Sequence, residues 1–368
     1  MRKWLLGRTF GLDKYSGLYI GAAFILIFGL WQPDLFLTTA TLHSVASSQA
    51  IVALLGLAVL VPLATGAYDL SVGSVANFAT ILVVSLQTTH NWAMWPAIGF
   101  TIVVGACIGA ISGFIVVVFK VNSFIATLAV ATILSAVQAI VSDQTQPLPP
   151  VSSAWTALAQ QDVFGFQIVF FYLIVIALIL WWLLAFTPVG RYMYATGGNL
   201  EAARLTGVRT GKWTWISLII SATVSSIAGV LYASIAGPSL TYGPALLLPA
   251  FAAAFLGSTQ FHPGRFNVWG TVVAVYVLAI GIKGLSFVTS VQWLNDMFNG
   301  IALIAAVSFA GWRYRNARTK VPPAAESGGT GNGPSPPQRD DDAGAATPTT
   351  AAAAVEPPSM SAQDAQRI

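Results

Sequence analysis

The chain has 368 residues, of which only 8% are charged and 56% are hydrophobic, and its formal net charge is +4. A water-soluble protein carries far more charge on its surface. The composition therefore excludes a soluble globular protein and predicts an all-α, polytopic bundle of transmembrane helices. The single cysteine, Cys107, excludes an intrachain disulfide, and the three histidines lie far apart in the sequence.

Ten apolar runs follow one another along the chain and are candidates for membrane spans. They cover residues 17–31, 49–64, 72–87, 96–119, 123–141, 166–187, 213–235, 245–258, 266–285 and 293–312. The third and eighth runs are short for a full crossing, so we expect about ten spans. Small residues recur every fourth position in two runs, which favours close packing of helices. They are Gly105, Gly109 and Gly113 in the fourth run and Ser217, Ser221 and Ser225 in the seventh.

The ends of the chain differ in composition from its centre. Arg2 and Lys3 precede an apolar run as in a signal peptide, but this run starts only near Gly17, with no cleavage pattern close behind it. We therefore interpret it as a retained first span. Beyond about residue 319 the residues are mostly Pro, Gly, Ala, Ser, Thr and Asp, which is typical of a disordered segment. The predicted domains are a cytoplasmic segment 1–16, a transmembrane domain 17–318 and a disordered cytoplasmic tail 319–368.

Basic residues indicate the orientation of the spans. If the N-terminus is cytoplasmic and ten spans follow, every Lys and Arg except Lys283 lies on the cytoplasmic side. The opposite loops contain Asp34, Asp143 and Asp162. This asymmetry follows the positive-inside rule and predicts that both termini are cytoplasmic.

The segment 188–212 is a polar, basic loop between two long apolar runs. Gly197 and Gly198 are expected to break the preceding structure, and Asn199 can cap a new helix by accepting a bond from a backbone amide. Glu201 lies in the first turn, where the helix dipole favours a negative charge, and Gly207 ends the helix. A short helix shown to one side of the bilayer suits a membrane subunit that is pushed by a soluble partner. An ordinary loop with one capped helical turn is the alternative.

Catalytic motifs are missing from the sequence. Residues 207–212 superficially resemble a phosphate-binding loop, but Thr206 stands where that pattern needs glycine and Trp213 where it needs serine or threonine. We expect no ATP hydrolysis, no catalytic group and no metal site in this chain, so energy for any transport must come from a partner.

Four stretches resemble a known family. Residues 66–74 are similar to the G-x-x-D-L-S-V-G-S segment of the ribose/xylose-type sugar permeases of ABC importers, and residues 121–128 resemble that family's x-x-P-x-F-I-x-T-L stretch. Residues 187–191 and 194–207 resemble its T-x-x-G-R-x-x-Y-A-x-G-G-N-x-x-A-A-R-L-x-G segment. The resemblance covers roughly residues 17–312. Residues 246–259 differ from the acidic, Gly-Gly-rich stretch of the family, so the resemblance does not identify the solute.

The resemblance implies the permease subunit of an ATP-driven importer that moves a monosaccharide-like solute by alternating access. It would lie in the inner or plasma membrane of a bacterial cell. The implied partners are two cytoplasmic ABC ATPase subunits or domains, an extracytoplasmic solute-binding protein and a second permease subunit, identical or related. The chain would bind no cofactor itself, because ATP is held by the partner subunits, and no nucleic acid.

The resemblance also implies two groups of site residues. The ATPases would dock on the coupling loop 188–212, through Gly190, Arg191, Gly197, Gly198, Asn199, Glu201, Ala202, Ala203, Arg204 and Gly207. The candidates for the translocation path are Asp69, Ser71, Asn77, Asn122, Phe124, Gln138 and Asn299. For Asp69, capping of the following span is an alternative. For the Asn and Gln residues and Phe124, an interhelical contact without solute is the alternative.

The sequence leaves other functions open. The same machinery could carry a nucleoside, an autoinducer-type furanone or a branched-chain amino acid. An ion-coupled secondary carrier would need an acidic residue deep in a span, and a membrane enzyme would need a convergent set of nucleophile, base or metal ligands.

Overall fold

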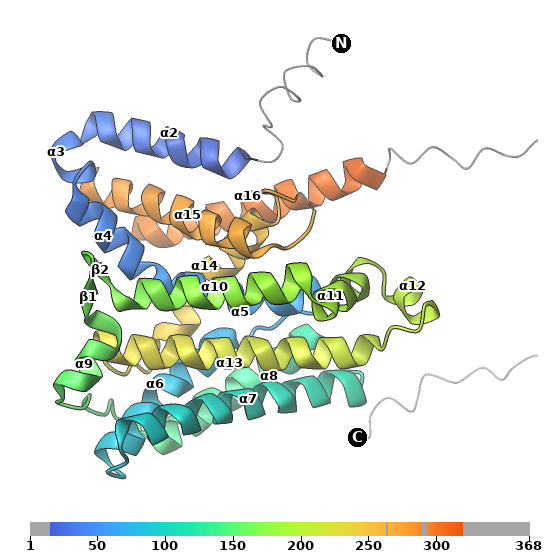
Figure 1. Ribbon diagram of the computed structural model, residues 1–368, viewed down its shortest axis with the longest axis horizontal. Coiled ribbons are helices and arrows are strands. Elements are labelled where there is room, and N and C mark those ends of the chain that lie inside the picture. The colour runs from blue at the N-terminus through green and yellow to red at the C-terminus, as the bar shows by residue number, and fades with distance from the viewer. Residues whose placement is uncertain (1–14, 263, 289–290, 292, 319–368) are drawn as a thin grey trace, which may run out of the picture. The chain divides into compact units, whose positions relative to one another are not determined.

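The computed structural model describes residues 15–262, 264–288, 291 and 293–318, so the predicted tail lies outside the described residues. The described chain is almost entirely helical (Figure 1). Its elements are α2 (Ser16–Trp31), α3 (Pro33–Phe36), α4 (Thr39–Ser48), α5 (Ala50–Ala64), α6 (Val72–Thr88), α7 (Met94–Val118), α8 (Ser123–Val141), α9 (Ser153–Gln160), β1 (Asp162–Val163), β2 (Phe166–Gln167), α10 (Ile168–Phe186), α11 (Pro188–Gly198), α12 (Leu200–Leu205), α13 (Thr210–Ala236), α14 (Tyr242–Gly257), α15 (Val268–Val288) and α16 (Trp293–Arg318).

A helix covers each of the ten predicted apolar runs, which confirms an all-α polytopic membrane protein. Within the described residues, six helical segments are long and apolar enough to cross a bilayer, and α2, α6 and α14 are shorter apolar helices. The second run is longer than predicted, because α4 and α5 together provide the apolar segment 39–63. The count of ten spans and the cytoplasmic location of both termini stay predictions.

Local side-chain bonds define several helix ends. At the start of α8, the Asn122 side chain accepts a bond from the Phe124 backbone amide. At the start of α9, the Ser152 side chain accepts a bond from the Trp155 backbone amide. These caps satisfy amides that have no partner within the helix. The segment between α8 and α10, expected as a plain loop, contains α9 and a two-stranded hairpin in which Asp162 pairs with Gln167.

Helix α5 lies at the centre of the core, and all fifteen of its residues are buried. A helix that is apolar on every side lies either in lipid or inside a protein core, and the complete burial of α5 shows that it lies inside the core. Helices α13, α14, α15 and α10 pack against α5, and α13 also packs along α6 and α7. In Figure 1, α10 and α13 cross the middle of the bundle, with α2 and α15 on one side and α7 and α8 on the other.

The small residues of α7 allow its close packing against α13, as predicted. A Cβ atom added at Gly109 would lie 2.6 Å from the Leu218 carbonyl oxygen, and one added at Gly113 would overlap the Trp215 ring. Close approach of backbones is the usual basis of helix association in lipid.

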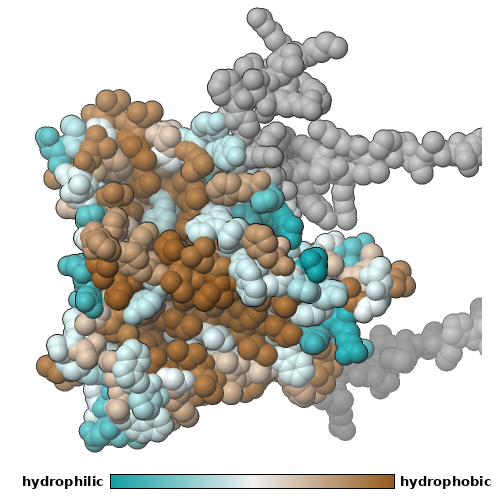
Figure 2. Space-filling model, viewed as in Figure 1, coloured by the Kyte–Doolittle hydropathy of each residue, from teal (hydrophilic) through white to brown (hydrophobic). Residues whose placement is uncertain are grey.

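Hydrophobic and hydrophilic residues occupy different zones of the surface along the length of the helices. Hydrophobic residues cover the middle of the face shown in Figure 2, and hydrophilic residues gather at its two ends. Large apolar side chains such as Val103, Ile133 and Ile179 are exposed on the outer helices. This pattern is the one that a bilayer requires, because lipid replaces water around the middle of the bundle.

Candidate coupling site

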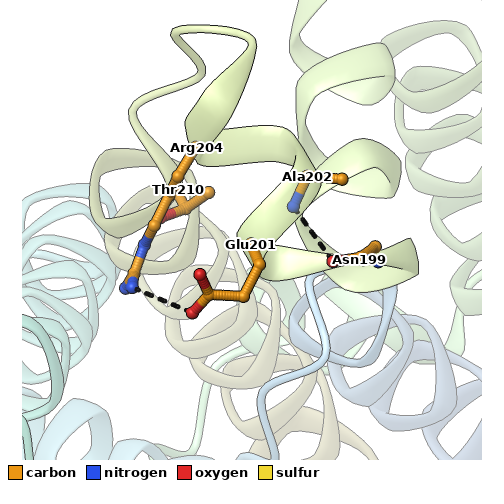
Figure 3. A network of polar contacts seen from close by, with 5 residues as sticks. All are labelled: Asn199, Glu201, Ala202, Arg204 and Thr210. Atoms are coloured by element: carbon orange, nitrogen blue, oxygen red, sulfur yellow. Dashed lines mark hydrogen bonds and ion pairs between the residues drawn. The ribbon is translucent and has the colours of Figure 1, made fainter. Parts of the chain in front are cut away.

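The predicted capped helix of the coupling loop is present as α12. The Asn199 side chain accepts a bond of 3.0 Å from the Ala202 amide (Figure 3). Gly207 has a φ of +83°, and the following Val208 amide donates back to the Ala203 carbonyl at 3.0 Å. A glycine with positive φ is a common helix terminator, so both predicted ends of this helix are confirmed.

The preceding helix ends at the predicted glycine pair, because α11 stops at Gly198. Both glycines are its last residues, and the chain leaves the helix at Asn199, where φ is −156°. The segment 188–212 is thus two helices joined at Asn199. Glycine costs a helix only about 1 kcal/mol relative to alanine, and the contacts of α11 with the bundle offset that cost.

Replacing Asn199 by alanine should weaken α12 by roughly 0.5–2 kcal/mol, because the Ala202 amide loses its partner. The expected result is faster hydrogen exchange at the amides of residues 200–206, with little change in α13. Asn199→Ser keeps a capping oxygen and should exchange like the unchanged chain. Equal exchange in the alanine and serine variants would show that the cap does not stabilise α12.

Helix α12 presents charged and apolar side chains to its surroundings. Glu201 and Arg204 approach to 4.0 Å, and their side chains are 83% and 58% exposed. Such an exposed ion pair contributes little to stability. The Arg204 Nε also donates to Thr210 Oγ1 at the start of α13 (3.2 Å). Ala203 is buried against the bundle while Leu205 is exposed. Glu201, Arg204 and Leu205 therefore form a small surface that another protein can contact.

Helix α11 anchors α12 to the bundle. Its buried residues, Gly190, Met193 and Thr196, lie on one face at helical spacing, and a side chain at Gly190 would overlap the Leu184 carbonyl at the end of α10. The predicted coupling-loop residue Arg191 is exposed. On another side, the Tyr192 ring stacks on Trp213 of α13 at 5.1 Å.

Tyr194 fixes α11 to the turn before α15. Its hydroxyl donates to the Phe266 carbonyl at 2.6 Å, and the Arg265 guanidinium lies 3.6 Å from the centre of its ring. Burial raises the pKa of Tyr194, although the nearby Arg265 acts in the opposite direction. The phenol therefore stays protonated at neutral pH and remains a donor.

The end of α11 contacts the loop between α5 and α6, residues 65–71, which we call the junction loop. Gly66 has a φ of +80° and turns the chain sharply. A Cβ atom added at Gly197 would overlap the Ala64 carbonyl oxygen and lie 3.0 Å from the Gly66 amide nitrogen. Backbone therefore touches backbone at this point, and a displacement of α11 acts directly on the junction loop.

Asp69 ties the junction loop to α13. This carboxylate is 1% exposed. Its Oδ1 accepts bonds from the Ser71 amide (3.0 Å) and the Ser71 hydroxyl (2.6 Å), and its Oδ2 accepts a bond of 2.8 Å from the Ser221 hydroxyl. The N-cap of α6 is Ser71, without a side-chain capping bond. Asp69 therefore orders the turn before α6 rather than capping that helix.

Further bonds tie the junction loop to α8. The Tyr68 amide donates to Ser123 Oγ and the Leu70 amide donates to Thr127 Oγ1, both at 3.0 Å. Contacts thus run from α12 through α11 and the junction loop to α8 and α13. The sequence motif around Asp69 indicated that this loop is important, but the sequence did not identify Ser221, Ser123 or Thr127 as its hydrogen-bond partners.

The other path candidates bond to the protein itself. Asn77 Nδ2 donates to Gln138 Oε1 at 2.6 Å, and Gln138 Nε2 donates to the Leu240 carbonyl at 3.0 Å. Asn122 caps α8. Phe124 is exposed near the start of α8, and Asn299 is half-buried in α16. A role of these residues in the path stays a prediction.

Across the described part of the chain, no cluster of three or more His, Cys, Asp or Glu residues is placed to hold a metal ion.

Comparisons with known proteins identify the family of the chain. A family model described as branched-chain amino acid transport system / permease component matches residues 41–307. The chain is 26% identical to the D-allose transport system permease protein of Escherichia coli (strain K12) over 297 residues, which are 80% of this chain and 91% of the relative. It is 29% identical over 306 residues to the autoinducer 2 import system permease protein of Photorhabdus luminescens (81% and 90%). It is 27% identical over 293 residues to the ribose import permease protein of Escherichia coli (strain K12) (77% and 89%). No solved structure matches the chain.

Proposed function

Since the chain belongs to the family of branched-chain amino acid transport system permease components, we propose that it is the membrane-spanning subunit of an ATP-driven importer for a monosaccharide-like solute. It is a multi-pass protein of the bacterial inner membrane, and ATP is hydrolysed by separate subunits. The observation that carries the proposal is α12, a capped helix that projects at one end of the bundle (Figure 1) and is connected through α11 to the spans.

In the proposed topology, ten spans place α12 and both termini in the cytoplasm. The basic residues Arg191, Arg204, Arg209 and Lys212 belong to the segment around α12. The hairpin β1–β2 and α3 lie at the opposite end of the bundle (Figure 1) and contain Asp162 and Asp34. Cytoplasmic ends of membrane proteins are enriched in Lys and Arg, which supports this orientation.

The proposed mechanism uses the contacts of the junction loop. Two partner ATPases bind ATP, close and displace α12. Helix α11 moves with α12 because only Asn199 separates them, and it presses on the junction loop at Gly66. Bonds from this loop to Ser221 and Thr127 then pass the motion to α13 and α8. Packed helices transmit such motion as rigid bodies. A second permease subunit and an extracytoplasmic solute-binding protein complete the assembly.

A sugar fits the proposed site better than an ion. Among the residues whose burial the structure describes, which leaves out Asp296, Asp69 is the only buried acidic side chain, and both of its oxygens accept bonds from serines. A proton- or sodium-coupled carrier needs an intramembrane charge that is available to the ion. The relatives named for D-allose and ribose import support a monosaccharide.

Reversing the charge of Glu201 tests the docking of the ATPases. We expect Glu201→Lys to abolish stimulation of the partner ATPase by solute-loaded binding protein, because it replaces the Glu201–Arg204 pair by two like charges and reverses the charge at the proposed contact surface of α12. The measurement is ATP hydrolysis in proteoliposomes that contain the full transporter. Asp34→Lys makes the same charge change at the opposite end of the bundle and should leave stimulation intact. Retained stimulation in Glu201→Lys would refute the docking role of α12.

A further inference from the structure

A cavity of ≈ 480 Å³ with a mixed polar and apolar lining lies between α4, the β1–β2 hairpin, the last turns of α13 and the start of α14. We call it the outer pocket. These elements lie at the end of the bundle opposite α12 (Figure 1). Small-molecule sites commonly have volumes of roughly 300–1,000 Å³. In the proposed topology the outer pocket faces the side from which the solute arrives.

Hydroxyl and amide groups from four elements converge on the outer pocket. Ser44 and Ser47 come from α4, Gln167 from β2, Tyr232 from α13 and Tyr242 from α14. Within the described residues, no hydrogen bond engages the hydroxyl groups of Ser44, Tyr232 or Tyr242. Ser47 Oγ accepts a bond of 3.3 Å from the Gln167 backbone amide, so its hydroxyl can still donate to a bound molecule. The pocket therefore offers several donors and acceptors to a bound molecule.

The two tyrosines give the outer pocket an aromatic wall. Their rings are stacked almost parallel, with centroids 3.5 Å apart and an interplanar angle of 9°. Aromatic faces carry partial negative charge and attract the weakly positive C–H groups of a sugar ring. Aromatic surface next to hydroxyl groups is thus suited to a ring that is apolar on its faces and polar at its rim.

The wall is held rigidly from behind. The Tyr242 amide donates to Ser239 Oγ at 3.2 Å, and the next amide, of Gly243, donates to Asn77 Oδ1 at 2.9 Å. Asn77 is in turn bonded to Gln138, which holds the Leu240 carbonyl. These bonds fix the start of α14 before any solute binds, which reduces the ordering cost of binding. Asn77 and Gln138 support this wall from outside the pocket.

The charges of the lining select for a neutral ligand. Asp162 on β1 is the acidic side chain of the lining, His43 on α4 is its imidazole, and neither Lys nor Arg lines the pocket. A carboxylate accepts bonds from hydroxyl groups but repels phosphates and other carboxylates. Sugar phosphates and sugar acids are therefore disfavoured.

We propose that the outer pocket binds one neutral polyhydroxyl solute, of the size of a monosaccharide, between its delivery and its passage through the membrane. The free face of one tyrosine of the stacked pair contacts a face of the solute ring, and Ser44, Ser47 and Gln167 bind its hydroxyl groups. This inference rests on the proposed function, because it takes the pocket to be open to the extracytoplasmic side.

Protection of an introduced cysteine tests the proposal in the full-length chain. The starting variant is Cys107→Ser, which removes the exposed native thiol. Ser48→Cys in α4 and Ile235→Cys in α13, which line the pocket but are not proposed to bind the solute hydroxyl groups, are then labelled in intact cells with a membrane-impermeant maleimide. The probes are D-ribose, D-allose, D-xylose and D-galactose at about 10 mM. For a Kd near 1 mM, a bound sugar slows labelling roughly tenfold. Asp34→Cys, at the same end of the bundle but outside the pocket, should be labelled at one rate with and without sugar.

Three outcomes bear on the proposal. Slower labelling of both pocket cysteines by at least one sugar, but not by ribose 5-phosphate, supports it, and adding Tyr242→Ala should then remove the protection. No slowing by any of the four sugars overturns it, as does equal slowing at Asp34→Cys. Labelling does not require the ATPase partner. If solute-loaded binding protein still stimulates ATP hydrolysis but no sugar protects the cysteines, the outer pocket is rejected and the proposed function is not. Pocket cysteines that react only from the cytoplasmic side reject the proposed topology.

Discussion

Gly197→Ala should uncouple solute uptake from ATP hydrolysis, whereas Gly198→Ala should leave both unchanged. The Cβ atom of an alanine at position 197 would overlap the Ala64 carbonyl, so α11 must move away from the junction loop. At position 198 the same atom meets nothing within 4 Å. Overpacking of this kind costs about 1–3 kcal/mol, which corresponds to roughly a 5- to 150-fold change in a coupled equilibrium.

The measurement is the ratio of solute taken up to ATP hydrolysed in proteoliposomes. Both substitutions raise helix propensity equally, so their difference reports the contact between α11 and the junction loop. We expect Gly197→Ala to lower the ratio by about tenfold while basal hydrolysis continues. Equal ratios in the two variants would mean that α11 does not act through the junction loop.

Elements set by local chemistry are predicted well from this sequence. The spans follow from long apolar runs, because lipid forces every backbone group to bond within its own helix. The ends of α12 follow from Asn199 and Gly207, because caps depend on residues only a few positions away. The hairpin β1–β2 was missed, since each strand has only two residues and shows no alternation.

Contacts between distant segments were not predictable. Gly197 was expected to break a helix, but its lack of a side chain also serves a contact with Gly66, far away in the sequence. Asn77 and Gln138 were chosen as polar residues within spans, but whether such a residue faces solute or another helix depends on tertiary packing. The outer pocket was missed for the same reason, because its tyrosines and serines come from segments that meet only in the folded chain.

Asp69→Ala should destabilise the protein and abolish uptake. The change leaves the Ser71 amide, the Ser71 hydroxyl and the Ser221 hydroxyl without their acceptor in a buried place. An unsatisfied buried donor costs about 1–3 kcal/mol. Asp69→Asn keeps the Oδ1 acceptor, and its amide can donate to Ser221 Oγ, so we expect partial recovery of thermal stability and uptake. Both are measured on purified transporter and in proteoliposomes.

A double-mutant cycle separates the bond to α13 from a general effect on the turn. Ser221 donates to Asp69, whereas Ser225, one turn later in α13, donates to the Ser221 carbonyl. Asp69→Ala combined with Ser221→Ala should be non-additive by about 0.5–3 kcal/mol in thermal stability, because both changes remove one bond. Asp69→Ala combined with Ser225→Ala should be additive. Additive effects in both pairs would show that the Asp69–Ser221 bond does not couple the junction loop to α13. Transmission from the loop would then have to use its other bonds, to Ser217 in α13 and to Ser123 and Thr127 in α8.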